Sequence, residues 1–226
     1  MRQKLSIIIP SLRPYNFSEL ITNLEVNSDG DIEIIAVTNE EIISSYKDYN
    51  ILPIKFIIDD KKIGTTYAIQ KGLEHCTGDF IITLSDDCLI APNAFQHMFN
   101  GFGFKSSTPL CIGNFQVYDH TGLMPKLGYF GKQFSMFPFT TRQTIDKLGM
   151  YYSTEFNSYF SDPDLGIRLA EKGGYIYNCP TAFIYHRFNN DEIYRNNKSK
   201  YFKKDEETFI KKWYKLGIFQ GVETLK

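Results

Sequence analysis

The sequence predicts an α/β fold, with a Rossmann-like, mostly parallel sheet flanked by helices and an irregular, aromatic second half. Along the first part of the chain, short runs rich in Ile, Val and Phe alternate with amphipathic segments, as in parallel strands joined by right-handed helical crossovers. The run at residues 80–84 leads straight into Asp86 and Asp87. Because carboxylates are almost never buried without a partner, this strand should end where they begin.

Each element of the first half follows from its own residues. The Ile-rich run at residues 4–10 predicts a strand that ends at Pro10 and Ser11. A helix follows, with Leu20, Ile21 and Leu24 on one face. The pattern predicts helices at 16–26 and 65–76, and further strands at 31–37, 54–58 and 80–84.

The second half is less regular. Residues 92–110 predict a helix and a loop, and residues 111–150 contain short strand-like pieces among Gly and Pro. Beyond them we expect a helix at 163–172, short strands at 175–178 and 182–185, a polar loop at 189–200 and a final helix at 203–215.

Composition narrows the class of protein. The 226 residues are 42% hydrophobic and 23% charged, with a net charge of −1, which favours a globular enzyme and gives no field that would attract nucleic acid. The four cysteines have no CxxC spacing, so we expect reduced structural thiols. The apolar run near the N-terminus is too short for a signal peptide or a membrane span, so a cytoplasmic location is expected.

Asp86 and Asp87 are the first candidate site. Ligands of open α/β sheets bind at the carboxyl ends of the strands, and two acids there can hold Mn²⁺ or Mg²⁺, which in turn holds a diphosphate. We expect Asp87 to be the direct ligand and Asp86 to face the sugar or an outer-shell water. An acidic turn in contact with water is the alternative.

Asp162 is the second candidate. As an N-cap followed by Pro163, with Asp164 complementing the helix dipole, it would simply begin a helix. A carboxylate at a helix start that opens into a cleft can also serve as a general base.

Two further segments carry possible ligands. His186 follows a short apolar strand, where it either caps the strand or completes a metal shell. Lys62 and Gly64 precede a helix start that could attract phosphate, or they form an ordinary basic loop and helix cap.

The order of these pieces resembles the family-2 glycosyltransferases of the GT-A fold. Strand one ending IIIPS, a Gly-led helix after strand three, GDFIITLSDD, SDPDLGIRLAEKGGYIYNCP and a distal His carry the resemblance over roughly residues 4–188. The more specific first half matches the family pattern at Lys62, Gly64, Ala68, Gly72, Gly78 and Asp79.

The resemblance implies roles for individual residues. Pro10 and Ser11 would lie beside the nucleotide base, and Asp87 would be the last acid of the D-x-D motif. Asp162 would be the catalytic base of inverting members, and His186 the distal metal ligand. Asp164 and Arg168 match the family's helix start, where they would be structural.

The sequence departs from the family pattern at three places. Asn39 stands where an acid usually grips the base or ribose, so we expect it to hydrogen-bond the nucleotide without charge. Ser85 replaces the first acid of the D-x-D motif, and Ser161 replaces the Glu before Asp162. These changes put the nucleotide preference and the strength of metal binding in doubt.

The resemblance implies a metal-dependent, inverting transfer of a sugar from a nucleoside-diphosphate donor to an acceptor hydroxyl, in surface polysaccharide or glycoconjugate synthesis. The acceptor would be a carbohydrate or a lipid-linked one. The alternatives are a non-catalytic sugar- or nucleotide-binding relative and, less favoured because the loop after strand one has no Gly, a sugar-phosphate nucleotidyltransferase.

The resemblance also divides the chain into functional parts. Residues 1–188 would form the GT-A domain, with a nucleotide-sugar half at 1–100 and an acceptor half at 101–188, and residues 189–226 would form a C-terminal loop and helical extension. The extension is mildly basic, which allows peripheral membrane contact or a plain solvated face. The aromatic segment 113–142 would supply the acceptor face or ordinary core, with candidate residues Tyr118, Tyr129, Phe130, Phe134 and Phe137.

Overall fold

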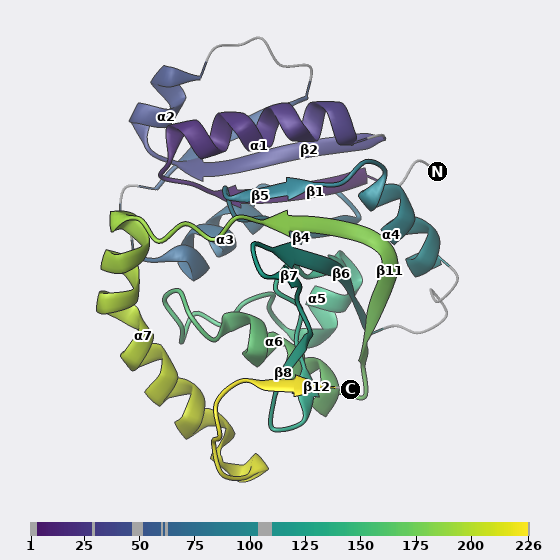
Figure 1. Ribbon diagram of the computed structural model, residues 1–226, viewed down its shortest axis with the longest axis vertical. Helices are drawn as coiled ribbons and strands as arrows, with labels where there is room; N and C mark the ends of the chain where they lie inside the picture. Colours follow the sequence, from purple (N-terminus) through teal and green to yellow (C-terminus); the bar gives the residue numbers. More distant parts are fainter. Residues whose placement is uncertain are drawn as a thin grey trace.

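A nine-stranded sheet forms the centre of the described structure, in the order β3-β2-β1-β4-β10-β6-β11-β5, with β7 paired to β6 (Figure 1). The computed structural model describes residues 4–28, 30–46, 52–59, 61, 63–103 and 110–225. A second sheet of three strands has the order β12-β8-β9.

The strands are β1 Lys4–Pro10, β2 Asp31–Thr38, β3 Ile54–Ile58, β4 Phe80–Thr83, β5 Cys88–Ile90, β6 Cys111–Asp119, β7 Gly122–Leu123, β8 Lys126–Tyr129, β9 Lys132–Gln133, β10 Phe139–Thr141, β11 Tyr175–His186 and β12 Glu223–Leu225. The helices are α1 Pro14–Asn27, α2 Glu40–Ser45, α3 Thr65–Leu73, α4 Ala94–Gly103, α5 Arg142–Leu148, α6 Ser161–Glu171 and α7 Glu192–Trp213, followed by a 3₁₀ turn at Tyr214–Leu216.

The first half of the sheet is parallel, as the sequence predicts. β1 pairs with β2 on one side and β4 on the other, with Ile7 opposite both Ile34 and Ile82. Strands β1 and β3 have the predicted bounds, and β4 ends at Thr83, just before the acidic pair. Parallel strands put their carboxyl ends at one edge, so the loops after β1, β2, β3 and β4 meet there.

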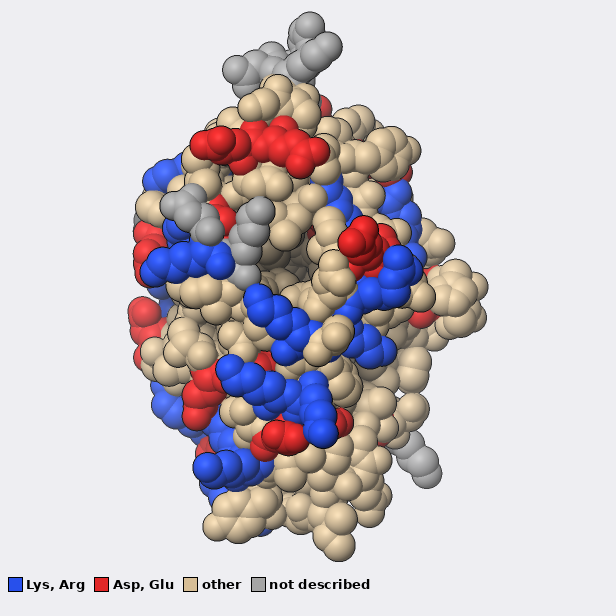
Figure 2. All heavy atoms as spheres, turned by 90° about the vertical axis from the view of Figure 1, so that its left-hand side faces the viewer, with Lys and Arg blue, Asp and Glu red and all other residues tan. Residues whose placement is uncertain are grey.

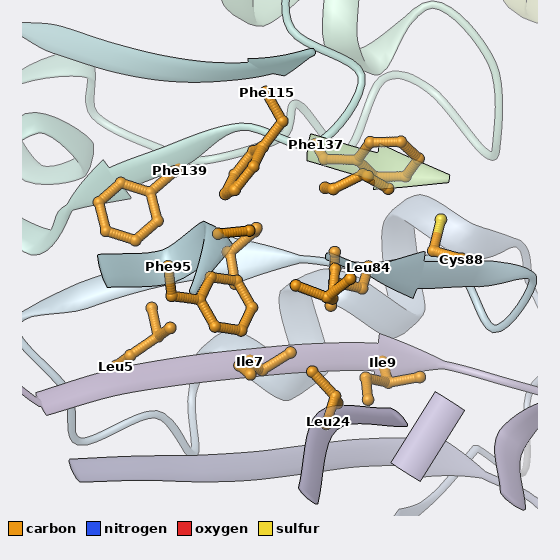
Figure 3. Close-up of a cluster of buried hydrophobic side chains, with 14 of the residues drawn as sticks. Leu5, Ile7, Ile9, Leu24, Leu84, Cys88, Phe95, Phe115, Phe137 and Phe139 are labelled. Atoms are coloured by element: carbon orange, nitrogen blue, oxygen red, sulfur yellow. The ribbon is translucent and has the colours of Figure 1, made fainter. Parts of the chain in front are cut away.

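Helices cover both faces of this sheet, and each face has its own apolar core. Side chains of α1, α2 and α4 pack on one face, where Leu24 and Phe95 meet Ile7 and Phe139 (Figure 3). Side chains of α3, α5 and α6 pack on the other face. Phe139 also stacks on Phe80 at 5.3 Å between ring centroids, which joins β10 to β4 in the first core. The large apolar area removed from water on both faces fixes the strand order and the edge where the loops gather.

The second half turns the sheet into a mixed one. β10 runs antiparallel between β4 and β6, and β11 runs parallel to β6 and antiparallel to β5. The two short strands predicted at 175–178 and 182–185 are one strand, β11, with a register shift between Asn178 and Phe183. Pro180 lies within that shift, and because proline cannot donate to a ladder, it fits a bulge.

Helix α6 begins earlier than predicted. Phe160 is its N-cap, in a left-handed conformation with φ of 62°, and makes no side-chain cap. Asp162 therefore lies inside the first turn, and its prediction as the N-cap is wrong. This position leaves the carboxylate free of the helix's own amides.

Helix α7 corrects the largest error in the sequence-based prediction. The polar loop expected at 189–200 is mostly helix, because α7 starts at Glu192 after Asp191, which accepts a hydrogen bond from the Tyr194 amide as an N-cap. Tertiary contacts outweigh the poor helix propensity of this Asn-rich segment. None of the helices that the structure describes is both long and apolar enough to cross a membrane.

Buried carboxylates hold α7 against the rest of the protein. Asp205 accepts hydrogen bonds at 2.8–3.1 Å from the backbone amides of Asn157, Ser158 and Tyr159. Asp164, which is fully buried in α6, accepts from Trp213 Nε1 at 3.1 Å and from Arg168 Nε at 2.7 Å. Asp164 and Arg168 are thus structural in this fold, as the resemblance implied.

The Asp205 contact gives a stability prediction. Replacing Asp205 with Asn removes the charge that three backbone amides share, and we expect a loss of about 2–3 kcal/mol in the free energy of unfolding by urea. Glu207→Gln, an exposed change on the same helix, is the control and should cost less than about 0.5 kcal/mol. Equal effects of the two changes would show that Asp205 does not anchor the helix.

Candidate functional site

A cavity of about 530 Å³ lies at the carboxyl edge of the parallel strands. Strand ends β1 to β4 contribute to one wall, and α3, α6 and α7 close the others. Of the predicted site residues, seven line it: Pro10, Ser11, Gly64, Asp86, Asp87, Asp162 and His186. Residues that are up to 176 positions apart in sequence therefore meet in one place.

Asp86 is held by two partners from the loop after β1. Ser11 Oγ donates to Asp86 Oδ2 at 2.7 Å, and Arg13 Nη1 donates to Oδ1 at 3.0 Å. Burial raises the pKa of Asp86 to about 6, although Arg13 and Ser11 favour its charged form. Both carboxylate oxygens are thus engaged, which suits a supporting role better than direct metal ligation.

Arg13 is a site residue that the sequence reasoning missed. Besides Asp86, it makes a bidentate ion pair with Asp191, at 2.5 and 3.0 Å, at the start of α7. Burial disfavours the guanidinium charge, but Asp191, Asp86 and Asp87 outweigh it and raise the pKa of Arg13. The only signal in the sequence was a lone Arg just after the first strand.

Asp87 and His186 form the candidate metal centre. Antiparallel pairing of β11 with β5 puts His186 opposite Cys88, and His186 Nε2 lies 3.2 Å from Asp87 Oδ1. Burial opposes ionisation of Asp87, but the hydrogen bond and charge of His186 outweigh it and lower the pKa of Asp87. Asp87 Oδ1 is buried, and its only polar contact among the described residues is the one with His186.

The donor set fits a hard or borderline divalent cation. Ligand atoms of Asp87, His186 and Cys88 lie within 4.8 Å of one another. Burial raises the pKa of Cys88 well above its ordinary value, so its sulfur stays a thiol within the apolar core (Figure 3). A carboxylate oxygen and an imidazole nitrogen remain, which suit Mn²⁺ and leave other positions open.

Asp162 reaches the same cavity from the first turn of α6. The Tyr152 hydroxyl donates a short hydrogen bond to its carboxylate. Burial raises the pKa of Asp162 to about 7, and the Tyr152 hydrogen bond partly offsets the rise. A carboxylate that titrates near neutrality and faces a cavity has the properties of a general base.

Gly64 is required by a close approach of two loops. Its φ is +133°, and a Cβ there would lie 2.3 Å from the Asn157 carbonyl oxygen. The amides of Thr65 and Thr66 at the start of α3 donate to Ser158 Oγ and to Asn157 O. The predicted phosphate site at this helix start therefore has two of its donors engaged elsewhere, and Lys62 lies outside the described residues.

The three departures from the family pattern occupy different environments. Asn39 caps α2 by accepting a hydrogen bond from the Ile42 amide at 3.0 Å and is not part of the cavity lining. Ser161 Oγ lies 2.6 Å from Thr66 Oγ1 and links α6 to α3. Ser85 lines the cavity. Asn39 and Ser161 thus have partners within the protein, and the nucleotide contact of Asn39 stays a prediction.

The predicted aromatic acceptor face is mostly not in the cavity. Phe137 does line it and meets His186 edge-on at 5.5 Å between ring centroids. Tyr129 and Phe130 instead pack beside the apolar cluster of α6 and α7, with Phe134 stacked on Tyr129. Tyr118 faces a separate groove, against Phe183. Three aromatic residues of the C-terminal segment that were not predicted also line the cavity: Phe188, Tyr194 and Tyr201.

Known proteins with similar sequences are glycosyltransferases. The model of the family "Glycosyl transferase family 2" matches residues 6–166. The amylovoran biosynthesis glycosyltransferase AmsE of Erwinia amylovora is 20% identical over 212 residues, which cover 87% of this chain and 80% of that protein.

Solved structures share the fold at low identity. GalNAc-T7 with UDP, GalNAc and Mn²⁺ superposes with a TM-score of 0.69 at 12% identity, over 92% of this chain and 50% of that one. The mannosyltransferase PcManGT from Pyrobaculum calidifontis, in complex with GDP-Man and Mn²⁺, gives 0.69 at 13% identity, over 93% and 65%. This chain thus spans half of the first structure's length and less than two thirds of the second's.

The family match covers more than half of the chain and includes β1, the acidic pair after β4 and the start of α6. The curled, mostly parallel sheet flanked by helices is the GT-A fold of the solved neighbours. The chain belongs to glycosyl transferase family 2.

Proposed function

We propose that this protein transfers a sugar from a nucleoside-diphosphate donor to an acceptor hydroxyl, with inversion at the anomeric carbon, in surface polysaccharide or glycoconjugate synthesis. The observation that carries the proposal is the convergence of the Asp87–His186 pair and Asp162 on one cavity. The nucleotides and Mn²⁺ in the two neighbouring structures, and the role in the name of AmsE, support it.

Asp87 and His186 would hold Mn²⁺ or Mg²⁺, with Oδ1 of Asp87 and Nε2 of His186, which lie 3.2 Å apart, as ligand atoms. Such a cation, once bound, would neutralise charge on the departing diphosphate. Asp86, fixed by Ser11 and Arg13, would face the donor sugar or a water on the metal. The carboxylate acts here through its fixed position, because both its oxygens already have partners in the protein.

Asp162 would act as the base. As the acceptor oxygen forms its bond to the anomeric carbon, the bond from that carbon to the diphosphate oxygen breaks, and the diphosphate leaves with the electron pair. The acceptor proton passes to the Asp162 carboxylate. One displacement opposite the leaving group inverts the anomeric centre.

The partners of the carboxylates favour this single displacement over a covalent intermediate. Asp86 has both oxygens held by Ser11 and Arg13, and Asp87 faces His186, so both carboxylates already have polar partners. Asp162 faces only the Tyr152 phenol among the hydrogen bonds that the structure describes, and burial keeps its proton affinity high. A group with high proton affinity is suited to accepting a proton from a hydroxyl.

Nucleotide and metal binding can be tested by thermal shift. We expect UDP, GDP, dTDP or CDP to raise the melting temperature only with Mn²⁺, because a ligand that binds the native state stabilises it by about 2.7 kcal/mol at 100 times Kd. Asp87→Ala and His186→Ala should remove the metal-dependent rise. Asp119→Ala, an acid outside the cavity lining, should keep it. A metal-independent rise, or none for any nucleotide, would contradict the proposed centre.

Asp162→Asn tests the base. We expect sugar transfer to fall about 10²- to 10⁴-fold, the usual contribution of a general base, with the nucleotide thermal shift retained. Asp146→Asn, an exposed change on α5, serves as the control and should leave transfer unchanged. Full transfer by the Asp162 variant would remove the residue from this role.

The pH profile gives an independent test. Because Asp162 must be ionised to accept a proton and its pKa is raised to about 7, kcat/KM should rise with pH through an apparent pKa near 7. Tyr152→Phe removes a hydrogen bond that favours the charged carboxylate, so the rise should move to higher pH. If the profile of that variant does not move, or moves to lower pH, the group that controls the pH dependence is not Asp162.

A further inference from the structure

One face of α7 lines the cavity, and the part of that face that extends beyond the cavity carries lysines. Ile193, Asn196, Asn197 and Lys200 line the cavity at spacings of three and four residues, so they form one stripe along the helix. Lys203 and Lys204 continue the stripe by one more turn, and both are exposed. The cavity wall thus runs without interruption into a cationic surface.

The lysines of this surface form no ion pair among the described residues. No described carboxylate oxygen lies within 4.0 Å of the side-chain nitrogens of Lys200, Lys203 or Lys204. Further along, Lys212 and Lys215 do have acidic partners. Of the acids that follow Lys204, Asp205 is buried with its oxygens on loop amides, and Glu206 and Glu207 lie on the same helix without a described ion pair to these lysines. On the face that α7 occupies, Lys and Arg gather below a hollow (Figure 2).

A local excess of positive charge on a chain with net charge −1 indicates an anionic partner. Lysine ammonium groups are point charges that bind phosphate, and the amides of Asn196 and Asn197 beside them can donate further hydrogen bonds. We propose that this face, centred on Lys200 and Lys203, binds a phosphate group carried by the acceptor sugar. The inference rests on the proposed transferase function, because it places the acceptor between α7 and Asp162.

The surface is less suited to a membrane. Helices that lie in a bilayer interface alternate basic residues with exposed large apolar ones. On α7 the described exposed large apolar side chain is Ile193 at the cavity end, whereas beside Lys203 and Lys204 Tyr201 is buried and Phe202 is half-buried. A flat bilayer surface would also not reach Lys200 in the cavity wall, whereas a phosphate on a sugar within the cavity would.

The test compares one glycoside with and without phosphate. Binding of octyl glucoside 6-phosphate and of octyl glucoside is measured by calorimetry on the full chain, with EDTA so that no metal holds the phosphate. We expect the phosphorylated glycoside to bind about 10-fold more tightly, and the preference to disappear in Lys200→Ala/Lys203→Ala and to weaken with salt. Lys211→Ala is the matched control, about 16 Å along the same helix from Lys200, and should keep the preference.

Two results would overturn the inference. One is equal binding of the two glycosides by the wild type. The other is a preference that survives in the double variant, which would put the phosphate elsewhere in the cavity. Sedimentation with phosphatidylglycerol vesicles, lost in the double variant while the glycosides bind equally, would assign the surface to a membrane instead.

A different measurement tests the proposed function itself. The wild type's Mn²⁺-dependent nucleotide shift reports on the donor site and does not involve the glycosides. If that shift is present and the phosphate preference is absent, only the acceptor inference is wrong. If the shift is absent, the transferase proposal fails whatever the glycosides do.

Discussion

The cavity depends on three carboxylates that fix helix α7. Asp191 holds its start through Arg13, Asp205 holds its middle through the amides of residues 157–159, and Asp164 holds its end through Trp213. The same contacts fix the loop before α6, because Asp205 takes up three of its backbone donors. Since one face of α7 is a cavity wall, the segment beyond residue 188 belongs to the site and is more than an appendage.

The carboxylates of this protein divide by how completely they are satisfied. Asp164 and Asp205 are fully buried, and each of their carboxylate oxygens accepts a hydrogen bond from within the protein, so these two groups stabilise the fold. The buried Oδ1 of Asp87 has only the described contact with His186, and burial raises the pKa of Asp162 with only the Tyr152 phenol to offset it. Incomplete satisfaction of a buried charge is unfavourable for folding, so it marks groups kept for chemistry.

The sequence predicted the part of the fold in which local pattern and tertiary environment agree. Strand β1 has the predicted bounds because its continuous Ile-rich run is stable in the interior of a parallel sheet, and β3 keeps its predicted bounds as the edge strand beside β2. Asp87 and Asp162 reach the predicted edge because chain direction alone puts strand ends together. Helix α7 could not be predicted, since its Asn-rich start is held by Asp191, whose ion-pair partner Arg13 lies far away in sequence. Arg13 was missed for the same reason.

Several side chains predicted to bind ligands have partners within the protein. The Ile42 amide donates to Asn39, and the rings of Phe209 and Phe219 lie against Tyr129 and Phe130. The two aromatic residues are thus the ordinary core that the sequence left open as the alternative, and the nucleotide contact of Asn39 stays a prediction. The lysines on α7 differ, because Lys200 and Lys203 have no described ion-pair partner, while Asp191, Asp205 and Asp164 hold the helix that carries them. Side chains that are paired within the protein stabilise the cavity, and side chains without such a described ion pair are available to bind a ligand in it.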